Sequence, residues 1–228
     1  MHEQSAVPEI EHWNFELREA GKDEQATFEI AFFSAKSANL KVIDNASGSD
    51  SLAQAAAREN SVAGVNGGYF DPNFKPLGLR VNASVITTPL THSRLLTGIF
   101  CASSRGFQIL RLAEPLPKKC VAAIECGPFL VDHGAAVKGL DDRRLARRTF
   151  TAVTRPEGAA LGVCTSAISL AELAQALTAL DLGRSKVWRA LNLDGGSSSA
   201  FWFRRNDGTT VSISEVKSVR DFVGVSGK

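Results

Sequence analysis

The stretch Leu191-Asn192-Leu193-Asp194-Gly195-Gly196-Ser197-Ser198-Ser199 closes an apolar segment, residues 187–193, with an acid that two glycines and three hydroxyls follow. The apolar segment predicts a buried strand, and the glycines predict a sharp change of direction after it. Such a junction leaves backbone N–H groups and hydroxyls beside one carboxylate, which suits anionic or polyhydroxyl ligands. Taken alone, the stretch is better explained as a tight Asp-Gly turn before a polar loop. Its interpretation therefore depends on the rest of the chain.

Length and composition favour one folded domain. The chain has 228 residues, of which 44% are hydrophobic and 22% charged, so it can bury a sizeable core and disorder is not expected. Its net charge of +2 gives no reason to expect nucleic-acid binding. No apolar run approaches the roughly 20 residues that span a bilayer. We expect residues 1–26 to be an N-terminal extension or first strand, and residues 27–228 to form the domain.

The N-terminal residues contain neither the basic nor the apolar region of a signal peptide. This predicts a periplasmic or secreted protein if a leader was removed, and a cytoplasmic one otherwise. The four cysteines, Cys101, Cys120, Cys126 and Cys164, form no C-x-x-C pair, so they are interpreted as buried thiols or one or two disulfides. The four histidines are scattered without ligand spacing, so no metal site or cofactor is predicted, and a Ca²⁺ or Mg²⁺ beside Asp194 has no support. Oligomeric state is left open.

The pattern of short strands predicts an α+β fold: a single domain with mixed or antiparallel sheets and a few packed helices. One helix is expected over 51–59, with Ser49 and Asp50 as capping candidates, and another over 170–182. The second begins with a Ser169/Glu172 capping box and is expected to stop at Gly183. Strands are predicted at 27–33, 40–43, 62–65, 121–124, 129–131, 149–154, 159–164, 187–193, 200–203 and 209–214.

Two further strand ends resemble the one at Asp194. Asn66-Gly67-Gly68-Tyr69 follows a short apolar strand, and the Asn side chain offers a donor and an acceptor to sugar hydroxyls. An Asn-Gly hairpin turn is the simpler explanation for this loop alone. Glu125-Cys126-Gly127-Pro128 follows another strand, where Glu125 either lies in a cleft with a raised pKa or is a strand-end acid in water.

Basic residues precede the strand expected at 149–154. The run Arg143-Arg144-Leu145-Ala146-Arg147-Arg148 would place Arg144 and Arg148 on one face if it were helical. Clustered guanidinium groups bind phosphate through forked hydrogen bonds. A solvated basic face, partly neutralised by Asp141 and Asp142, is an equal alternative for Arg143 and Arg144 but a weaker one for Arg148.

Taken in order, these motifs resemble the phosphodiester glycosidase family, whose bacterial members are often described as exopolysaccharide-related. The resemblance covers nearly the whole chain after about residue 27, and the helix followed by Asn-Leu-Asp-Gly-Gly is its most specific part. The matching stretches are Asn66-Gly67-Gly68-Tyr69-Phe70, Gly127-Pro128-Phe129-Leu130-Val131 with Gly134, Arg148-Thr149, the helix over 170–182, Asn192-Leu193-Asp194-Gly195-Gly196-Ser197-Ser198 and Val219-Arg220-Asp221-Phe222-Val223-Gly224-Val225.

The resemblance implies hydrolysis of a sugar 1-phosphodiester, such as an N-acetylglucosamine-1-phosphodiester, at the anomeric carbon, which releases sugar and a phosphomonoester. Because the leaving phosphate is already anionic, a cation to stabilise it is needed more than a strong general acid. This assigns Arg148 to the phosphate, Asp194 as nucleophile or base, and Glu125 as a weaker candidate for the second carboxyl. The substrate-binding residues implied are Asn66, Gly67, Gly68, Tyr69, Gly127, Asn192, Gly195, Gly196, Ser197 and Ser198.

The chain departs from the family at a few positions. The family usually has Gly at position 197 and Ser at 126, where this chain has Ser197 and Cys126. Its Arg-Thr-Ala-Val/Ile-Gly is Arg148-Thr149-Phe150-Thr151-Ala152 here, and Asp221 stands where proline is common. These differences keep polar side chains in place and affect the expected substrate.

Two other functions are compatible with these loops. The first is a non-catalytic protein of the cell envelope that binds a glycan or sugar phosphate, with no nucleic-acid partner and no membrane span. The second is a thiol hydrolase in which Cys126 pairs with His133, although nothing marks the third group that would orient such a pair. Release of free sugar from sugar 1-phosphodiesters distinguishes a glycosidase from a binding protein.

Overall fold

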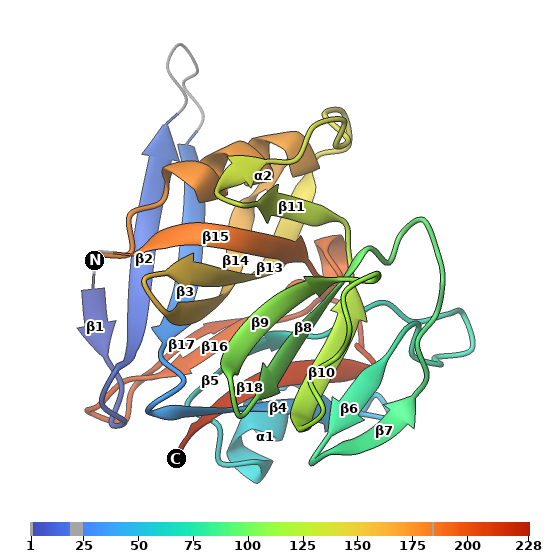
Figure 1. Cartoon of the computed structure of the whole chain (residues 1–228). Coiled ribbons are helices and arrows are strands. Elements are labelled where there is room, and N and C mark those ends of the chain that lie inside the picture. Colours follow the sequence, from blue (N-terminus) through green and yellow to red (C-terminus); the bar gives the residue numbers. More distant parts are fainter. Residues whose placement is uncertain (1, 19–24, 184) are drawn as a thin grey trace.

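Strands dominate the computed structural model, which describes residues 2–18, 25–183 and 185–228 (Figure 1). About half the chain, 51%, is in strands and only 9% is helical, so the predicted α+β class is wrong and the fold is mostly β. In the described residues the strands form three sheets, and every strand pair is antiparallel. Short turns explain the antiparallel pairing of consecutive strands such as β13 and β14, whereas other pairs join strands that are distant in the sequence.

The largest sheet has eight strands and contains the predicted hairpin at 149–164. In spatial order it consists of β1 (His2–Gln4), β2 (Ile10–Arg18), β3 (Gln25–Phe33), β14 (Gly158–Ile168), β13 (Ala146–Arg155), β15 (Lys186–Asn192), β11 (Phe129–Asp132) and β12 (Ala135–Ala136). The residues before 27 thus provide β1 and β2 of this sheet.

The other two sheets have five strands each. One consists of β7 (Val85–Thr88), β6 (Arg80–Asn82), β10 (Cys120–Cys126), β8 (Gly98–Ser103) and β9 (Gly106–Arg111). The other consists of β17 (Thr210–Ile213), β16 (Phe201–Arg204), β5 (Ala63–Asn66), β18 (Asp221–Gly227) and β4 (Ala38–Asp44). In the third sheet β5 lies beside β16 and β18, so strands from distant parts of the sequence pair directly.

A central core lies between the three sheets, and the period of the strands explains how it is filled. On β3, Ala31 and Phe33 point into this core, while Phe28 and Ile30 point to the opposite face, against α2 (Leu170–Ala179). Alternate residues of a strand face opposite sides of its sheet, so a strand covered on both sides is apolar throughout. This explains why β14 has a long apolar run, residues 159–164, without polar alternation.

The two α-helices of the described residues cover outer faces of sheets (Figure 1). α1 (Leu52–Arg58) packs on β5, β16 and β18, and its N-cap is Ser51 with Gln54 in a capping box, not the predicted Ser49 or Asp50. α2 begins with the predicted Ser169/Glu172 capping box. It ends at Ala179, before the predicted stop, because Leu180 is extended and buried; Gly183, with φ +72°, serves the next turn.

The arginine-rich segment 143–148 is not helical. Residues 141–145 are irregular and β13 begins at Ala146, so Arg144 and Arg148 do not share a helix face. The β8–β9 hairpin was not predicted, whereas β2 lies within residues 1–26, which were expected to be an extension or a first strand. In β2, His12, Asn14 and Glu16 alternate with apolar residues, which is the period-two pattern of a strand.

Candidate functional site

The loops that follow β5 and β15 meet, and the loop after β10 joins them. The Asp194 amide donates to the Gly67 carbonyl over 3.2 Å, and the Asn66 side-chain amide donates to the Asp194 carbonyl over 2.8 Å. The Asn192 amide donates to the Pro128 carbonyl over 3.0 Å. In Figure 1, β10 and β15 end on the same side of the molecule. The structure therefore brings the three strand-end motifs together.

Asp194 presents the most accessible carboxylate of the predicted set. It is partly exposed, and its Oδ1 accepts from the Gly195 amide over 2.9 Å. Burial raises the pKa of the carboxyl above its ordinary value, and the nearby charge of Asp221 adds to this, while hydrogen bonds from Ser198 and Gly195 oppose it. A partly buried carboxylate with a raised pKa is a stronger base than one in water, which suits proton transfer or attack on carbon.

Asn66 lies beneath the Asp194 loop and is fully buried. Its Oδ1 accepts from the Thr149 hydroxyl over 2.7 Å and from the Ala200 amide over 3.0 Å. With its amide on the Asp194 carbonyl, both ends of the side chain are engaged. The structure thus places Asn66 as a brace that joins the two loops to β13, rather than as a group exposed to a sugar.

Tyr69, Asn192 and Gly127 form a second connected group. The Tyr69 hydroxyl donates to the Gly127 carbonyl over 2.8 Å and accepts from the Asn192 side-chain amide over 2.9 Å. The same amide donates to the Gly127 carbonyl over 3.1 Å. Burial raises the pKa of Tyr69 far above its usual range, so its hydroxyl keeps its proton. Tyr69 is partly exposed, whereas Asn192 and Gly127 are buried.

Gly67 and Gly68 allow a close approach that a side chain would block. A Cβ on Gly67 would lie 1.8 Å from Oδ1 of Asp221, and one on Gly68 would lie 2.2 Å from Nη2 of Arg80. Asp221 accepts from the Gly68 amide and from Nε of Arg80, each over 2.8 Å. This buried ion pair, which sequence reasoning did not include in the site, therefore lies directly under the glycine loop. Arg80 gave no signal in the sequence, and Asp221 was noted as a departure from the family inside the matching stretch 219–225, without a role in the site.

Glu125, the predicted second carboxyl, is fully buried in β10 and not in water. One of its oxygens accepts from two backbone amides, those of Leu79 and Thr91. Asp194 and Glu125 therefore differ in access to substrate: the first is partly exposed and the second is enclosed by backbone.

The two arginines at the start of β13 have different surroundings. Arg148 is buried, and it donates from Nε to the Ile168 carbonyl over 2.9 Å and from Nη2 to the Arg144 carbonyl. Burial lowers the pKa of its guanidinium below the ordinary value. Arg147 is partly exposed and donates from Nε to the Gly196 carbonyl over 3.3 Å, while its buried Nη2 has no partner. A Cβ on Gly195 would lie 3.9 Å from Cδ of Arg148, so both side chains lie beside the loop after Asp194, and sequence reasoning selected only Arg148.

The loop after Asp194 turns through η1 (Gly196–Ser198). Gly196 has φ +65°, a left-handed conformation that favours glycine. Gly195, Gly196 and Ser197 are partly exposed, whereas Ser198 is buried. The Ser197 carbonyl accepts from the Val216 amide over 2.8 Å, which ties this loop to the segment before β18. The exposed part of the predicted site therefore consists of Asp194, Tyr69 and the loop 195–197.

The thiol alternative finds little support in the geometry. Cys126 is fully buried, and burial raises its pKa to about 12, which disfavours the thiolate. His133 lies exposed in the turn after β11, within 3.1 Å of Asp132 and against Trp188. All four cysteines are free thiols.

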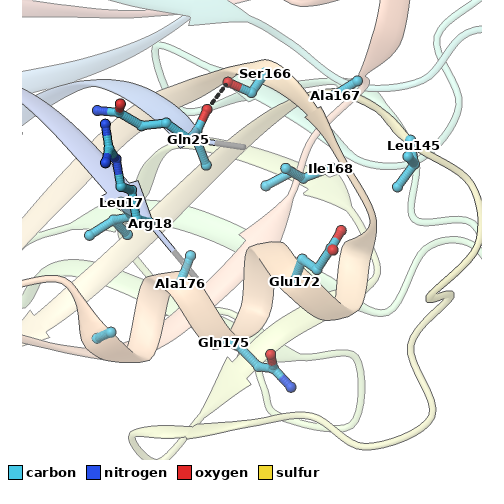
Figure 2. A pocket seen from close by; sticks show the side chains of 12 residues that line it. Leu17, Arg18, Gln25, Leu145, Ser166, Ala167, Ile168, Glu172, Gln175 and Ala176 are labelled. Atoms are coloured by element: carbon cyan, nitrogen blue, oxygen red, sulfur yellow. Dashed lines mark hydrogen bonds between the residues drawn. The ribbon is translucent and has the colours of Figure 1, made fainter. Parts of the chain in front are cut away.

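The described residues contain no cluster of three or more His, Cys, Asp or Glu side chains placed to hold a metal ion. Neither α-helix in the described part of the chain is long and apolar enough to cross a membrane. A pocket of about 630 Å³ lies apart from the predicted site residues, between the β2–β3 hairpin and α2 (Figure 2). Its wall includes Leu17, Gln25, Ile168 and Glu172, and none of the predicted site residues lines it.

Most of the chain matches a known protein family. A family model described as phosphodiester glycosidase matches residues 59–226. A search of curated proteins found no significant match.

Several solved structures share the fold. The catalytic domain of zebrafish N-acetylglucosamine-1-phosphodiester alpha-N-acetylglucosaminidase, solved in a form auto-inhibited by its pro-peptide, superposes with a TM-score of 0.75 at 15% identity, over 100% of this chain and 88% of that one. A hypothetical protein from Synechocystis gives 0.67 at 17% identity, over 96% of this chain and 62% of that one. A protein from Burkholderia pseudomallei gives 0.61 at 13% identity, over 91% and 75%. At these identities the likeness concerns the fold alone.

Proposed function

Since this chain belongs to the phosphodiester glycosidase family, and is thus of a hydrolase type, we propose that it cleaves a sugar 1-phosphodiester at the anomeric carbon. The products are a free sugar and a phosphomonoester. The observation that carries the proposal is the place of Asp194: a partly exposed carboxylate with a raised pKa, in a loop held by Asn66 and Gly67. The N-acetylglucosamine in the name of the zebrafish protein makes it the first sugar to test.

A single accessible carboxylate fits the chemistry of this leaving group. Two carboxyl groups are used by ordinary glycosidases, because an alkoxide leaving group needs a proton. A phosphate monoester leaves as a stable anion, so the bond from the anomeric carbon to oxygen breaks without that proton. Asp194 is then free to act on the other side of the sugar, either by attacking the anomeric carbon or by taking a proton from the attacking water. Glu125 is enclosed and is not needed as the acid.

Positive charge near the loop would stabilise the departing phosphate. We assign this role to Arg148, as the family motif implies, and add Arg147, whose side chain contacts the Gly196 carbonyl. Tyr69 and the loop 195–197 would contact the sugar, because they are the exposed part of the site. Asn66, Asn192 and Gly127 would act from below by holding these groups in place. An exopolysaccharide or other cell-envelope glycan as the natural substrate remains part of the proposal.

The test measures sugar released from a panel of sugar 1-phosphodiesters, beginning with N-acetylglucosamine-1-phosphodiesters. Asp194→Asn is expected to lose at least about 100-fold in kcat while keeping its thermal unfolding cooperative. Asp181→Asn is the matched control, since Asp181 is exposed and lies after α2. Full activity of Asp194→Asn would refute its role. Binding of the substrates without release of sugar by the unaltered protein would instead favour a binding protein.

A second comparison tests the cations. Arg148→Ala and Arg147→Ala are assayed on a sugar 1-phosphodiester and on an aryl glycoside of the same sugar. Loss of a group that stabilises developing charge costs about 100-fold. Each variant is expected to lose this factor on the phosphodiester and little on the aryl glycoside, whose leaving group carries no phosphate. Equal losses on both substrates would show that the arginine is structural.

A further inference from the structure

The carboxylate of Glu125 joins two loops that reach the site. Its Oε2 accepts from the Leu79 amide over 2.7 Å and from the Thr91 amide over 3.0 Å. The Glu125 amide in turn donates to the Leu79 carbonyl over 2.9 Å. The other oxygen, Oε1, is buried without a partner. A Cβ on Gly78, which has φ +87°, would lie 2.9 Å from Oε2, so glycine is needed for the chain to pass this carboxylate.

The first of these loops, residues 67–79, carries Tyr69. The Leu77 amide donates to the Tyr69 carbonyl over 2.8 Å, which folds the loop back on itself near Leu79. Arg80 fixes the same segment, because its guanidinium donates to the carbonyls of Tyr69 over 3.3 Å and Glu125 over 3.2 Å. The hydrogen bond from the Leu79 amide to Glu125 therefore fixes the last residue of this loop against β10.

The second loop, residues 89–97, is largely exposed and ends against Gly127. The Thr97 amide donates to the Cys126 carbonyl over 2.9 Å, and the Thr97 hydroxyl accepts from the Phe129 amide over 2.8 Å. A Cβ on Gly127 would lie only 2.3 Å from the Leu95 carbonyl. Figure 1 shows this loop, between β7 and β8, arching beside the end of β10. The hydrogen bond from the Thr91 amide to Glu125 thus holds the first half of this loop against β10.

Both loops meet at Gly127: the first reaches its carbonyl through the Tyr69 hydroxyl, beside Asn192 of β15, and the second packs against its Cα through the Leu95 carbonyl. We infer that Glu125 is a positioning residue that fastens the loops 67–79 and 89–97 to β10, and thereby sets the Tyr69 hydroxyl and the wall of the sugar site. The inference rests on the proposed function for its kinetic part only. A positioning role differs from that of a second catalytic carboxyl. Positioning needs a side-chain oxygen that is close enough to accept from both amides, whereas acid catalysis needs a proton that can be transferred.

Two conservative variants separate these roles. Glu125→Gln keeps the reach and one acceptor oxygen, so both amide bonds persist. Glu125→Asp keeps the carboxyl group but is one methylene shorter, so it cannot hold both amides. Positioning predicts that Glu125→Gln stays within about threefold of the unaltered protein with the same pH profile, and that Glu125→Asp raises KM at least tenfold with little change in kcat. A general acid predicts the reverse order, with Glu125→Gln losing about 100-fold or more in kcat.

Hydrogen exchange supplies a readout that does not need turnover. The Leu79 and Thr91 amides are expected to exchange at least tenfold faster in Glu125→Asp than in the unaltered protein, and at an unchanged rate in Glu125→Gln. Unchanged exchange in Glu125→Asp, or a large loss of kcat in Glu125→Gln, would overturn the inference. If the unaltered protein releases no sugar, the proposed function fails, while the exchange rates still decide whether Glu125 positions the loops. If Glu125→Asp does not fold, the Glu125→Gln kinetics and exchange decide alone.

Discussion

Removing the charge of Asp221 should destabilise the protein strongly, because its partner is buried with it. Asp221 and Arg80 have side chains that are 3% and 2% exposed, and their ion pair spans 2.8 Å. Asp221→Asn is nearly isosteric and keeps an oxygen for the Gly68 amide, but it leaves the Arg80 charge uncompensated. Breaking one side of a buried ion pair costs about 3–5 kcal/mol. In a protein of this size each kcal/mol lowers Tm by roughly 2–4 °C, so Tm should fall by roughly 6–20 °C.

The assay is urea unfolding of Asp221→Asn, Arg80→Met and the double variant, followed by fluorescence. Because the partners lie in direct contact, the double variant should lose much less than the sum of the two single losses. The m-value should stay unchanged, since the surface exposed on unfolding is the same. A loss below about 1 kcal/mol in Asp221→Asn, or strict additivity in the double variant, would refute the view that this pair supports the glycine loop.

Two further predictions concern titration and thiols. Burial raises the pKa of Asp194 in the folded protein above its ordinary value of 3.8, so the native state binds the proton more tightly than the unfolded state. The free energy of unfolding should therefore fall as the pH rises from 3.8 to the pKa of the folded carboxyl. Unfolding curves of Asp194→Asn should lack this fall, and the acid limb of kcat/KM should lie above pH 3.8; an identical pH dependence in both proteins would contradict the assignment. For the thiols, a disulfide reagent at pH 8 should modify the half-buried Cys120 first, and this should not reduce the activity. The fully buried Cys126 should react only after the protein unfolds. Rapid labelling of Cys126 with inactivation would revive the thiol mechanism.

Much of the central sheet and the family were predictable from local patterns. The hairpin of β13 and β14 follows from two apolar runs around Arg155-Pro156-Glu157-Gly158, and the start of α2 follows from its capping box. The class was wrong because strands such as β8 and β9 were not recognised. Their neighbours on the sheet, rather than a clean alternation of residues, decide their conformation.

The candidate site was predictable only as a set of loops. Asn66, Tyr69, Asn192 and Asp194 do come together, but whether a side chain contacts substrate or supports the loop depends on burial that no motif records. The ion pair of Arg80 with Asp221 joins residues 141 positions apart, so no spacing could signal it. Glu125 is the clearest case, since a strand-end acid beside a glycine has the same sequence pattern whether it faces water or two backbone amides.

The position of β18 in the third sheet has a consequence for synthesis on the ribosome. β18 lies between β4 and β5, although it consists of Asp221–Gly227 and they lie within the first third of the chain. A nascent chain that has emerged only as far as Asp194 has its carboxylate but lacks the strand that completes the sheet beneath Asn66. Contacts of such sequence separation form late, since long loops must close first. β4 and the β18-facing edge of β5 therefore stay unpaired until residues 221–227 have been translated, and the nascent chain needs protection from aggregation up to that point.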